Sequence, residues 1–314
     1  MMLARVADSL YWMGRYIERA EHVARLADIM LTATLDRAVD AGRTQEIAVA
    51  AAGETPPAPG ALPMQAARRL VFDRSSAGGV LSSLARAREN ARQVRDQITT
   101  ETWERLNLLY LKVTGETAVD LFDMGASAFL HDVIADLHLF RGAADATMSH
   151  GEGFRFLMLG VYLERANLIA QLLEVCFGDG RGARSSDHVA EMNLLRMACA
   201  LEPYLRRYTA EIEPRLILEF LLFDEEFPRS IRFATARIEE NLGGISRLAR
   251  GGGLTAPDRL AGRLKARLEF ADMEELRAMD ASALLTDVVA DCARIHDAVH
   301  DAYVAYSLET RLPA

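Results

Sequence analysis

The residues in this sequence best suited to chemistry are two Glu-Arg dipeptides, because a carboxylate and a guanidinium together can pair ionically or hold a charged ligand. They lie in two copies of one pattern, GRYIERAEHVARL at residues 14–26 and GVYLERANLIAQL at residues 160–172. The identical pairs, at a constant offset of 146, are Gly14/Gly160, Tyr16/Tyr162, Glu18/Glu164, Arg19/Arg165, Ala20/Ala166, Ala24/Ala170 and Leu26/Leu172. Since this offset is close to half of the 314-residue chain, the repeat predicts an internal duplication.

A second, weaker repeat supports the same division of the chain. The Glu-Asn pair at residues 89–90 resembles the pair at residues 240–241, at an offset of 151. Together the two repeats predict two pseudo-equivalent helical halves, approximately residues 1–148 and 149–314, packed about an approximate twofold axis. We expect the two halves to form a single domain.

The direction of each side chain follows from the 100° turn per residue of an α-helix. In the first copy Glu18 lies on the polar face, whereas Arg19 lies inside the apolar arc. The second copy is more apolar, so its helix is predicted to be central and Arg165 to be buried. A buried arginine needs a partner, because an isolated buried charge costs several kcal/mol. The candidate partners are Glu18, Glu164, Glu89 and Glu240.

The Glu-Arg pairs allow two interpretations. In the first, they form a buried charge network that fixes the register of the helices. In the second, they line a polar pocket between the halves, where arginine forks bind the carboxylate of a small anion, a zwitterion or a peptide end. An enzyme built on such a pocket would use Glu18 or Glu164 as its acid or base.

Other kinds of site have less support in the sequence. The Glu-x-x-His motif of a di-iron bundle does not occur, and the pair His296 and His300 is more typical of a solvated face than of a metal site. The P-loop, G-x-G-x-x-G and G-x-S-x-G motifs are also absent. We therefore predict no metal and no cofactor.

Composition and charge restrict the class of protein further. The formal net charge is −9 and the basic residues are dispersed among acidic ones, which argues against nucleic-acid binding. The three cysteines form no C-x-x-C pair and lie in apolar helical stretches, so they are predicted to be buried, reduced thiols of a cytoplasmic protein. We expect no signal peptide and no apolar run of about 18 residues that could span a membrane.

Almost the whole chain has the apolar periodicity of helices. The predicted fold is all-α, an elongated bundle of about ten helices. Helices are predicted near residues 3–39, 79–98, 100–114, 116–147, 152–177, 187–210, 213–223, 228–248, 257–270 and 281–309. The principal breaks are predicted, from their proline, glycine and serine content, at residues 41–63, 74–79, 178–187, 226–228 and 250–257.

Five segments carry a resemblance to a known family. They are LARVADSLYWMGRYIERAEHVARL (3–26), SSLARARENARQVRDQITTETWERLNLLYL (82–111), EGFRFLMLGVYLERANLIAQLLEV (152–175), EFLLFDEEFPRSIRFATARIEENL (219–242) and AGRLKARLEF (261–270). With these segments the chain resembles the bacterial alpha-E family, helical proteins with a Glu-Arg motif, over essentially its full length. Residues 50–63 and 75–83 depart from the family pattern, which affects only loop contacts.

The resemblance implies a role beside other proteins. Alpha-E proteins look like partners of circularly permuted ATP-grasp proteins, sometimes fused to them, and of transglutaminase-like proteases. ATP-grasp enzymes activate a carboxylate as an acyl phosphate and join it to an amine. The resemblance therefore implies a helical partner or scaffold subunit, without an ATP site of its own, in a system that makes or modifies a peptide or small amide. The alternatives are an enzyme acting on a peptide or amide and a purely structural helical oligomer.

The repeat and the resemblance together select one polar set around the predicted site. The set is Tyr16, Glu18, Arg19, Arg88, Glu89, Asn90, Tyr162, Glu164, Arg165, Arg229 and Glu240. The two Glu-Arg dipeptides are carried over from the family motif, and four further residues fall on recurring family positions: Arg88, Glu89, Asn90 and Arg229. No catalytic residue is assigned. No nucleic-acid or membrane partner is predicted, and association of the chain with itself is left open.

Overall fold

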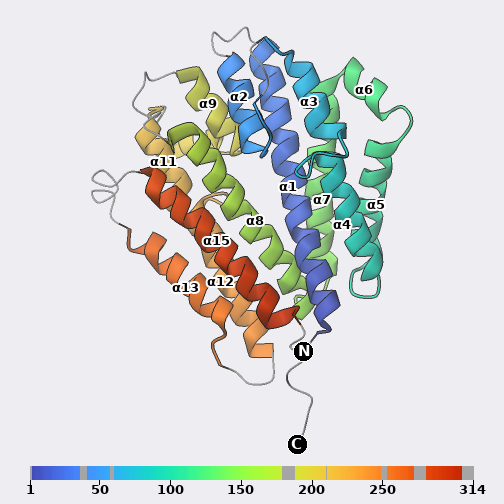
Figure 1. Cartoon of the computed structure of the whole chain (residues 1–314), viewed down its shortest axis with the longest axis vertical. Coiled ribbons are helices and arrows are strands. Elements are labelled where there is room, and N and C mark those ends of the chain that lie inside the picture. The colour runs from blue at the N-terminus through green and yellow to red at the C-terminus, as the bar shows by residue number, and fades with distance from the viewer. Residues whose placement is uncertain are drawn as a thin grey trace, which may run out of the picture.

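The computed structural model of the protein describes residues 2–35, 41–56, 60–178, 188–209, 211–248, 253–271 and 281–305. In these ranges the chain forms fourteen α-helices and no strand (Figure 1). The helices are α1 (Ala4–Leu35), α2 (Ala41–Ala51), α3 (Pro63–Phe72), α4 (Val80–Gln93), α5 (Thr100–Thr114), α6 (Ala118–Met124), α7 (Ala126–Thr147), α8 (Glu152–Phe177), α9 (His188–Met197), α10 (Leu201–Tyr208), α11 (Pro214–Phe223), α12 (Ile231–Leu248), α13 (Ala256–Glu269) and α15 (Ala281–Tyr303). The all-α prediction is confirmed, but the predicted number of about ten helices is too low.

Two long helices, α1 and α8, lie side by side at the centre of the molecule and run in the same direction (Figure 1). Helices α4 and α7 pack on α1, and α5 packs on both α4 and α7. In the same way α12 and α15 pack on α8, and α13 packs on both α12 and α15. The two sets of four helices therefore follow one packing order on either side of the α1–α8 contact.

The close approach of α1 and α8 depends on the two glycines of the repeated pattern. A Cβ atom at Gly14 would overlap the carbonyl oxygen of Leu157, and one at Gly160 would overlap the carbonyl oxygen of Tyr11. Any larger residue at either position would push the two helices apart. Tyr11 and Leu157 are themselves 146 residues apart, so the two glycine contacts correspond to each other under the offset of the repeat.

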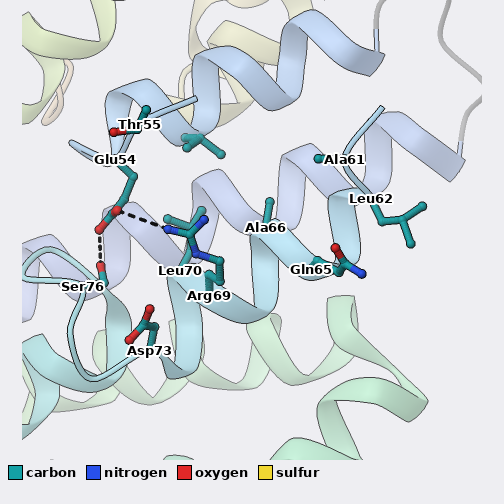
Figure 2. Close-up of a pocket in the computed structure, with 11 residues that line it drawn as sticks. Glu54, Thr55, Ala61, Leu62, Gln65, Ala66, Arg69, Leu70, Asp73 and Ser76 are labelled. Carbon is teal, nitrogen blue, oxygen red and sulfur yellow. Dashed lines mark hydrogen bonds and ion pairs between the residues drawn. The ribbon is translucent and has the colours of Figure 1, made fainter. Parts of the chain in front are cut away.

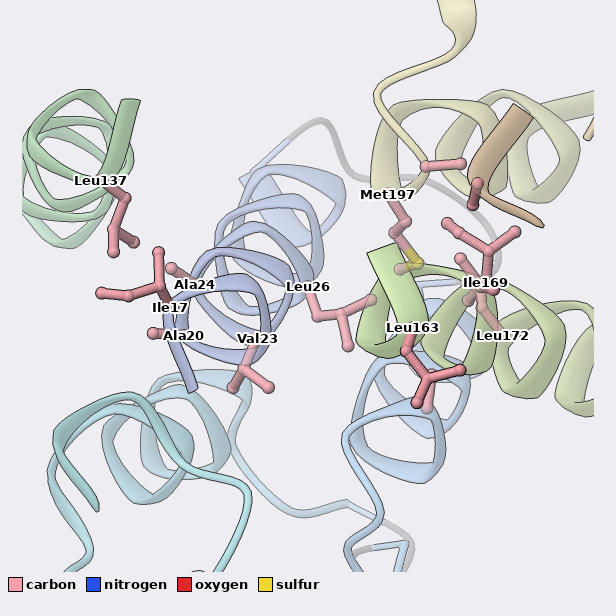
Figure 3. Packing of buried hydrophobic residues seen from close by; sticks show 14 of the residues in the cluster. Ile17, Ala20, Val23, Ala24, Leu26, Leu137, Leu163, Ile169, Leu172 and Met197 are labelled. Carbon is pink, nitrogen blue, oxygen red and sulfur yellow. The ribbon is translucent and has the colours of Figure 1, made fainter. Parts of the chain in front are cut away.

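Apolar side chains fill the space around these two helices (Figure 3). Ile17 and Leu26 of α1 and Leu163 and Leu172 of α8 are completely buried. By length and composition α8 could cross a membrane, but 78% of its most apolar window is buried inside the protein. The sequence prediction of no such apolar run is therefore wrong. The run belongs to a core helix, which agrees with the predicted central position of the second repeat.

The predicted breaks differ from the structure mainly before α4. The predicted break at residues 41–63 contains α2, and residues 63–72, to which no helix was assigned, form α3. The segment that forms α2 is rich in alanine, which favours helix, and it packs on α1 and α8. Two predicted helices are each divided, between α6 and α7 and between α9 and α10. Most of the predicted break at 178–187 and part of that at 250–257 lie outside the described residues.

The three cysteines are free thiols. Cys176 in α8 and Cys292 in α15 are buried, and burial raises the pKa of each thiol to about 12. Cys199 is exposed, because it lies in the break between α9 and α10, where its backbone φ is 57°. The prediction of buried thiols is therefore wrong for Cys199.

Candidate functional site

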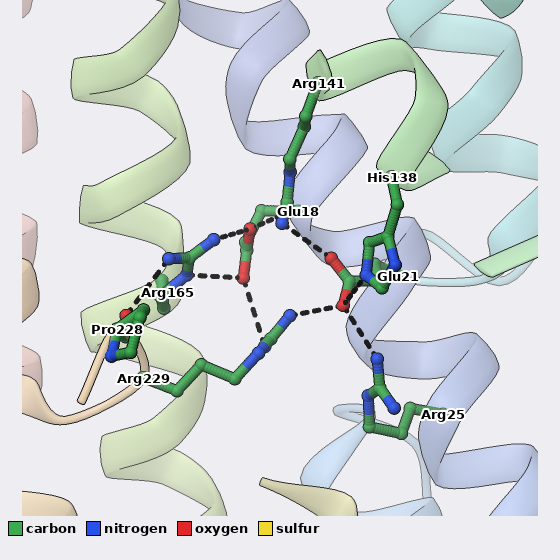
Figure 4. A network of polar contacts seen from close by, with 8 residues as sticks. All are labelled: Glu18, Glu21, Arg25, His138, Arg141, Arg165, Pro228 and Arg229. Carbon is green, nitrogen blue, oxygen red and sulfur yellow. Dashed lines mark hydrogen bonds and ion pairs between the residues drawn. The ribbon is translucent and has the colours of Figure 1, made fainter. Parts of the chain in front are cut away.

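The two Glu-Arg repeats meet across the α1–α8 contact. Arg165 of α8 donates from Nε and from Nη2 to the carboxylate of Glu18 on α1, both at 2.9 Å (Figure 4). Its Nη1 donates to the carbonyl oxygen of Pro228 at 3.0 Å. The side chains of Glu18 and Arg165 are only 1% and 8% exposed. The predicted burial of Arg165 is confirmed, and Glu18 is its partner among the predicted candidates.

A second acid, Glu21, lies one turn after Glu18 on α1 and links this pair to further elements. Arg141 of α7 donates to Glu18, and its Nη1 lies 2.8 Å from Oε2 of Glu21. Arg229, on the turn before α12, donates to both carboxylates (Figure 4). Side chains from α1, α7, α8 and the α11–α12 connection thus converge on two adjacent acids.

The carboxylate of Glu21 has two further partners, which are less deeply buried. Nη2 of Arg25 donates to it at 3.0 Å, and Nε2 of His138 on α7 donates to it at 3.2 Å. We name the whole set the Glu18 network; its members are Glu18, Glu21, Arg25, His138, Arg141, Arg165 and Arg229. Four guanidiniums therefore face two carboxylates in the interior of the protein.

Burial opposes ionisation of these carboxylates, but the guanidiniums outweigh it. Burial alone would raise the pKa of Glu18, but the charges of Arg141, Arg165 and Arg229 lower it to about 2. Burial would likewise raise the pKa of Glu21, but Arg229 and Arg141 hold it well below its usual value. Both acids are therefore ionised at neutral pH, and neither carries a proton to donate to a substrate.

His22 is buried beside these two acids on α1, with an exposed fraction of 1%. Neither of its ring nitrogens has a hydrogen-bond partner within the described part of the chain. Burial and the positive charge of Arg229 lower the pKa of His22 to about 4, so the ring is neutral at neutral pH. The equivalent position in the second repeat is the apolar residue Leu168.

The second repeated acid, Glu164 of α8, is fully buried. Its two oxygens accept hydrogen bonds from Nε of Arg15 and Nε of Arg19, both on α1 and both at 2.6 Å. Nη1 of Arg15 also reaches the hydroxyl of Tyr11 at 3.5 Å, and that hydroxyl lies 2.9 Å from Nδ1 of His296 on α15. We name these five residues the Glu164 cluster.

The repeated residues pair crosswise in the Glu18 network and the Glu164 cluster. Each repeated glutamate pairs with the repeated arginine of the other helix. Glu18 pairs with Arg165, and Arg19 pairs with Glu164, so the offset of 146 converts one ion pair into the other. Contacts that are reciprocal in this way are characteristic of an approximate twofold relation between two surfaces. The Glu-Arg motif is thus the contact by which α1 and α8 recognise each other.

Two other acids that were predicted as candidate partners of the buried arginine lie elsewhere. Glu89 is exposed on α4 and pairs with Arg92 at 2.7 Å, and its neighbour Asn90 is half-buried. Glu240 is exposed on α12 and pairs with Arg237 at 2.5 Å. Their helical faces point away from the α1–α8 contact, so neither acid joins the Glu18 network or the Glu164 cluster.

The remaining residues of the predicted polar set lie around the α1–α8 contact or support neighbouring helices. The guanidinium of Arg19 lies 5.8 Å from the ring centre of Tyr16, and that of Arg165 lies 5.1 Å from the ring centre of Tyr162. Each repeated tyrosine therefore makes a cation–π contact with the repeated arginine of its own helix. Arg88 of α4 instead donates to an asparagine of α5 at 2.8 Å.

Seven members of the Glu18 network and the Glu164 cluster were not in the predicted set: Tyr11, Arg15, Glu21, Arg25, His138, Arg141 and His296. Arg15, Glu21 and Arg25 stand three or seven residues from Glu18, on one face of α1, so helical spacing was an available signal for them. His138 and Arg141 are on α7, and no local pattern in the sequence specifies how α7 aligns with α1.

A hollow of about 90 Å³ lies away from these residues, between α3 and the connection that precedes it (Figure 2). Leu62 and Leu70 are among the apolar residues that line it. Glu54, at its edge, accepts a hydrogen bond from Ser76 at 2.6 Å and lies 3.9 Å from Arg69. The lining residues belong neither to the Glu18 network nor to the Glu164 cluster.

Known proteins share the sequence pattern of this chain. The Alpha-E family model, described as a predicted alpha-helical domain with a conserved ER motif, matches residues 2–304. Uncharacterised proteins of Mycobacterium bovis and of Mycobacterium tuberculosis strains CDC 1551 and H37Rv are each 26% identical over 323 residues. These alignments cover 95% of the chain but 36% of each relative, so the chain spans about a third of their length. No solved structure matches the chain significantly.

Proposed function

This chain belongs to the Alpha-E family, and on that basis we propose that it is a helical partner or scaffold subunit of an ATP-grasp ligase system. It has no ATP site of its own, and the system synthesises or modifies a peptide or small amide. The observation that carries the proposal is the use of both repeated glutamates in ion pairs across the α1–α8 contact. Acids held in this way organise a helical framework and leave bond formation to a partner.

The length of the relatives supports a role in combination with other protein domains. The chain aligns with 36% of each mycobacterial relative, so the same helical unit is joined there to further polypeptide. From the family resemblance, the proposed partner is a circularly permuted ATP-grasp protein, and a transglutaminase-like protein is the second candidate. A cytoplasmic location shared with this partner is part of the proposal.

The alternative function, an enzyme that uses Glu18 or Glu164 as its acid or base, has less support. A general acid or base works best with a pKa near the working pH. The pKa of Glu18 is about 2, and both Glu18 and Glu164 are buried and already accept two or more hydrogen bonds from arginines. These properties favour the scaffold function.

We also propose that the two halves arose by duplication and fusion of one ancestral unit. The repeated pattern, the repeated packing order and the reciprocal Glu-Arg pairs all support this origin. Two shorter helices add to this support. Helix α3 spans Pro63–Phe72 and α11 spans Pro214–Phe223, so they have equal length, begin with proline and end with phenylalanine at an offset of 151.

The proposed function is tested with two purified proteins, this chain and an ATP-grasp protein encoded in the same genome. We expect them to elute together in size-exclusion chromatography with light scattering. We also expect ATP consumption, with a peptide or an amine as acceptor, to rise when both are present. Separate elution and unchanged ATP consumption would contradict the proposal, and self-association of this chain alone would favour the structural oligomer.

A further inference from the structure

The Glu164 cluster contains hydrogen-bond donors that its acid does not use. Arg15 bonds to Glu164 through Nε, and Arg19 does so through Nε and Nη2. Nη2 of Arg15 and Nη1 of Arg19 make no hydrogen bond to any described residue. The two side chains are 12% and 21% exposed, so part of each remains accessible to solvent.

A third guanidinium contacts the same aromatic ring as Arg19. The guanidinium of Arg86 on α4 lies 5.7 Å from the ring centre of Tyr16, and that of Arg19 lies 5.8 Å from the same ring centre. Arg86 is exposed, and its one hydrogen bond to a described residue is to the carbonyl oxygen of Ala77 at 3.4 Å. No carboxylate in the described ranges lies within ion-pair distance of it.

The equivalent arginine of the second half shows that this lack of a partner is specific to Arg86. Arg237 corresponds to Arg86 at the offset of 151. It also lies over an aromatic ring, that of Phe233, but it pairs with Glu240 at 2.5 Å. In the first half the equivalent acid, Glu89, pairs with another arginine instead.

The charges around Tyr16 are therefore unbalanced. Arg15 and Arg19 share one buried carboxylate, and Arg86 has no carboxylate within ion-pair distance in the described part of the chain. Of two further acids, Asp8 bonds to Trp12, which stacks on Tyr16, and Asp297 lies beside a histidine of α15. Positive charge that is not neutralised by the protein attracts anions to this face.

We propose that the face formed by Arg15, Arg19 and Arg86 binds the oxyanion group of a ligand, a carboxylate or a phosphate. Guanidinium forks match the geometry of both groups. Glu164 serves as a positioning residue, because it holds Arg15 and Arg19 through their Nε atoms and leaves other nitrogens available to a ligand. This site goes beyond the proposed function, since it does not depend on which protein is the partner.

The test uses the fluorescence of Trp12, which stacks on Tyr16 at 5.3 Å, in a Trp103→Phe background that removes the second tryptophan. The full chain is titrated at constant ionic strength with sodium acetate, sodium phosphate and sodium chloride. We expect acetate or phosphate to shift the emission in a saturable way that chloride does not reproduce. Tighter binding of acetate identifies a carboxylate ligand, and tighter binding of phosphate identifies a phosphate ligand.

Matched variants locate the site. Arg86→Gln changes an exposed residue outside the core and is expected to weaken binding of the better anion about threefold to tenfold. Arg237→Gln, the equivalent change in the second half, is expected to leave binding unchanged. Equal effects of the two variants, or identical titrations with all three salts, would overturn the proposal.

Discussion

The Glu18 network and the Glu164 cluster place the same dipeptide at equivalent positions but surround it differently. Glu18 is enclosed by arginines from α7, α8 and the turn before α12, whereas the arginines that hold Glu164 come from α1. The first repeat also supplies a second acid, Glu21, where the second repeat has Asn167. One glutamate of the motif thus lies in a closed internal network, whereas the other is held by arginines that are partly exposed.

The largest expected effect is a loss of folding stability, and it differs between variants of the two repeated arginines. Arg165→Ala removes a bidentate partner of a buried carboxylate and is expected to lower the free energy of unfolding by about 3 kcal/mol or more. Arg19→Ala is expected to lower it by about 1 kcal/mol, because Arg19 is 21% exposed and Arg15 still pairs with Glu164. Urea denaturation of both variants measures the difference. Equal losses would mean that the two copies of the motif contribute equally.

The second-largest expected loss of stability comes from the close contact between α1 and α8, on which the Glu18 network and the Glu164 cluster both depend. Gly14→Ala and Gly160→Ala each place a Cβ against a backbone carbonyl and are expected to destabilise the protein by about 2 to 3 kcal/mol. Gly142→Ala in α7 is the matched control, because a Cβ there meets no atom within 4 Å. The control is expected to be neutral or stabilising by up to about 1 kcal/mol. Thermal unfolding distinguishes them, and an unchanged Tm for Gly14→Ala would refute the close approach.

A smaller effect depends on pH and distinguishes the two repeats at His22. Its pKa is about 4 in the folded protein, below the ordinary value of 6.5. Between these values the unfolded chain binds more protons, so stability falls as the pH drops from about 6.5 towards 4, by about 2 kcal/mol. His22→Leu, which copies Leu168, is expected to remove this loss in urea denaturation at a series of pH values.

Glu18 produces a separate loss at lower pH that His22→Leu is expected to retain. Its pKa is lowered from 4.5 to about 2, so its contribution to stability is present above about pH 4.5 and is lost as the pH falls towards 2. If His22→Leu had the same acid sensitivity as the unmodified protein between pH 6.5 and 4.5, the assignment to His22 would be wrong.

The smallest expected effect comes from Arg25, at the outer edge of the Glu18 network. Arg25→Gln installs the residue that the second repeat has at the equivalent position, Gln171. Glu21 keeps its contacts with Arg141 and Arg229, so the variant is expected to lose only the i,i+4 pair, about 0.5 kcal/mol. Chemical denaturation measures this loss, and a loss as large as that of Arg165→Ala would show that the edge and the centre of the network are equally important.

Several features of the fold and site could be predicted because they depend on local periodicity. The apolar periodicity predicted an all-α protein, and the extra apolar faces of the second repeat predicted a buried Arg165. The cost of an isolated charge then predicted that Arg165 is paired. The helix formed by residues 41–51 was not predicted, because proline-rich residues just after it dominated the assignment, although its alanines favour helix and its contacts with α1 and α8 hold it in place.

The sequence by itself determined the repeat, the helical class and the need to neutralise the Glu-Arg pairs, because each follows from residue types and their spacing along one chain. The tertiary structure decided which charges meet. Arg141 and Arg229 reach Glu18 from α7 and from the turn before α12, while Glu89 and Glu240 point outwards. Spacing along a helix fixes the face on which a residue lies, but the packing of helices distant in sequence fixes its partner, and that packing is set by the whole core.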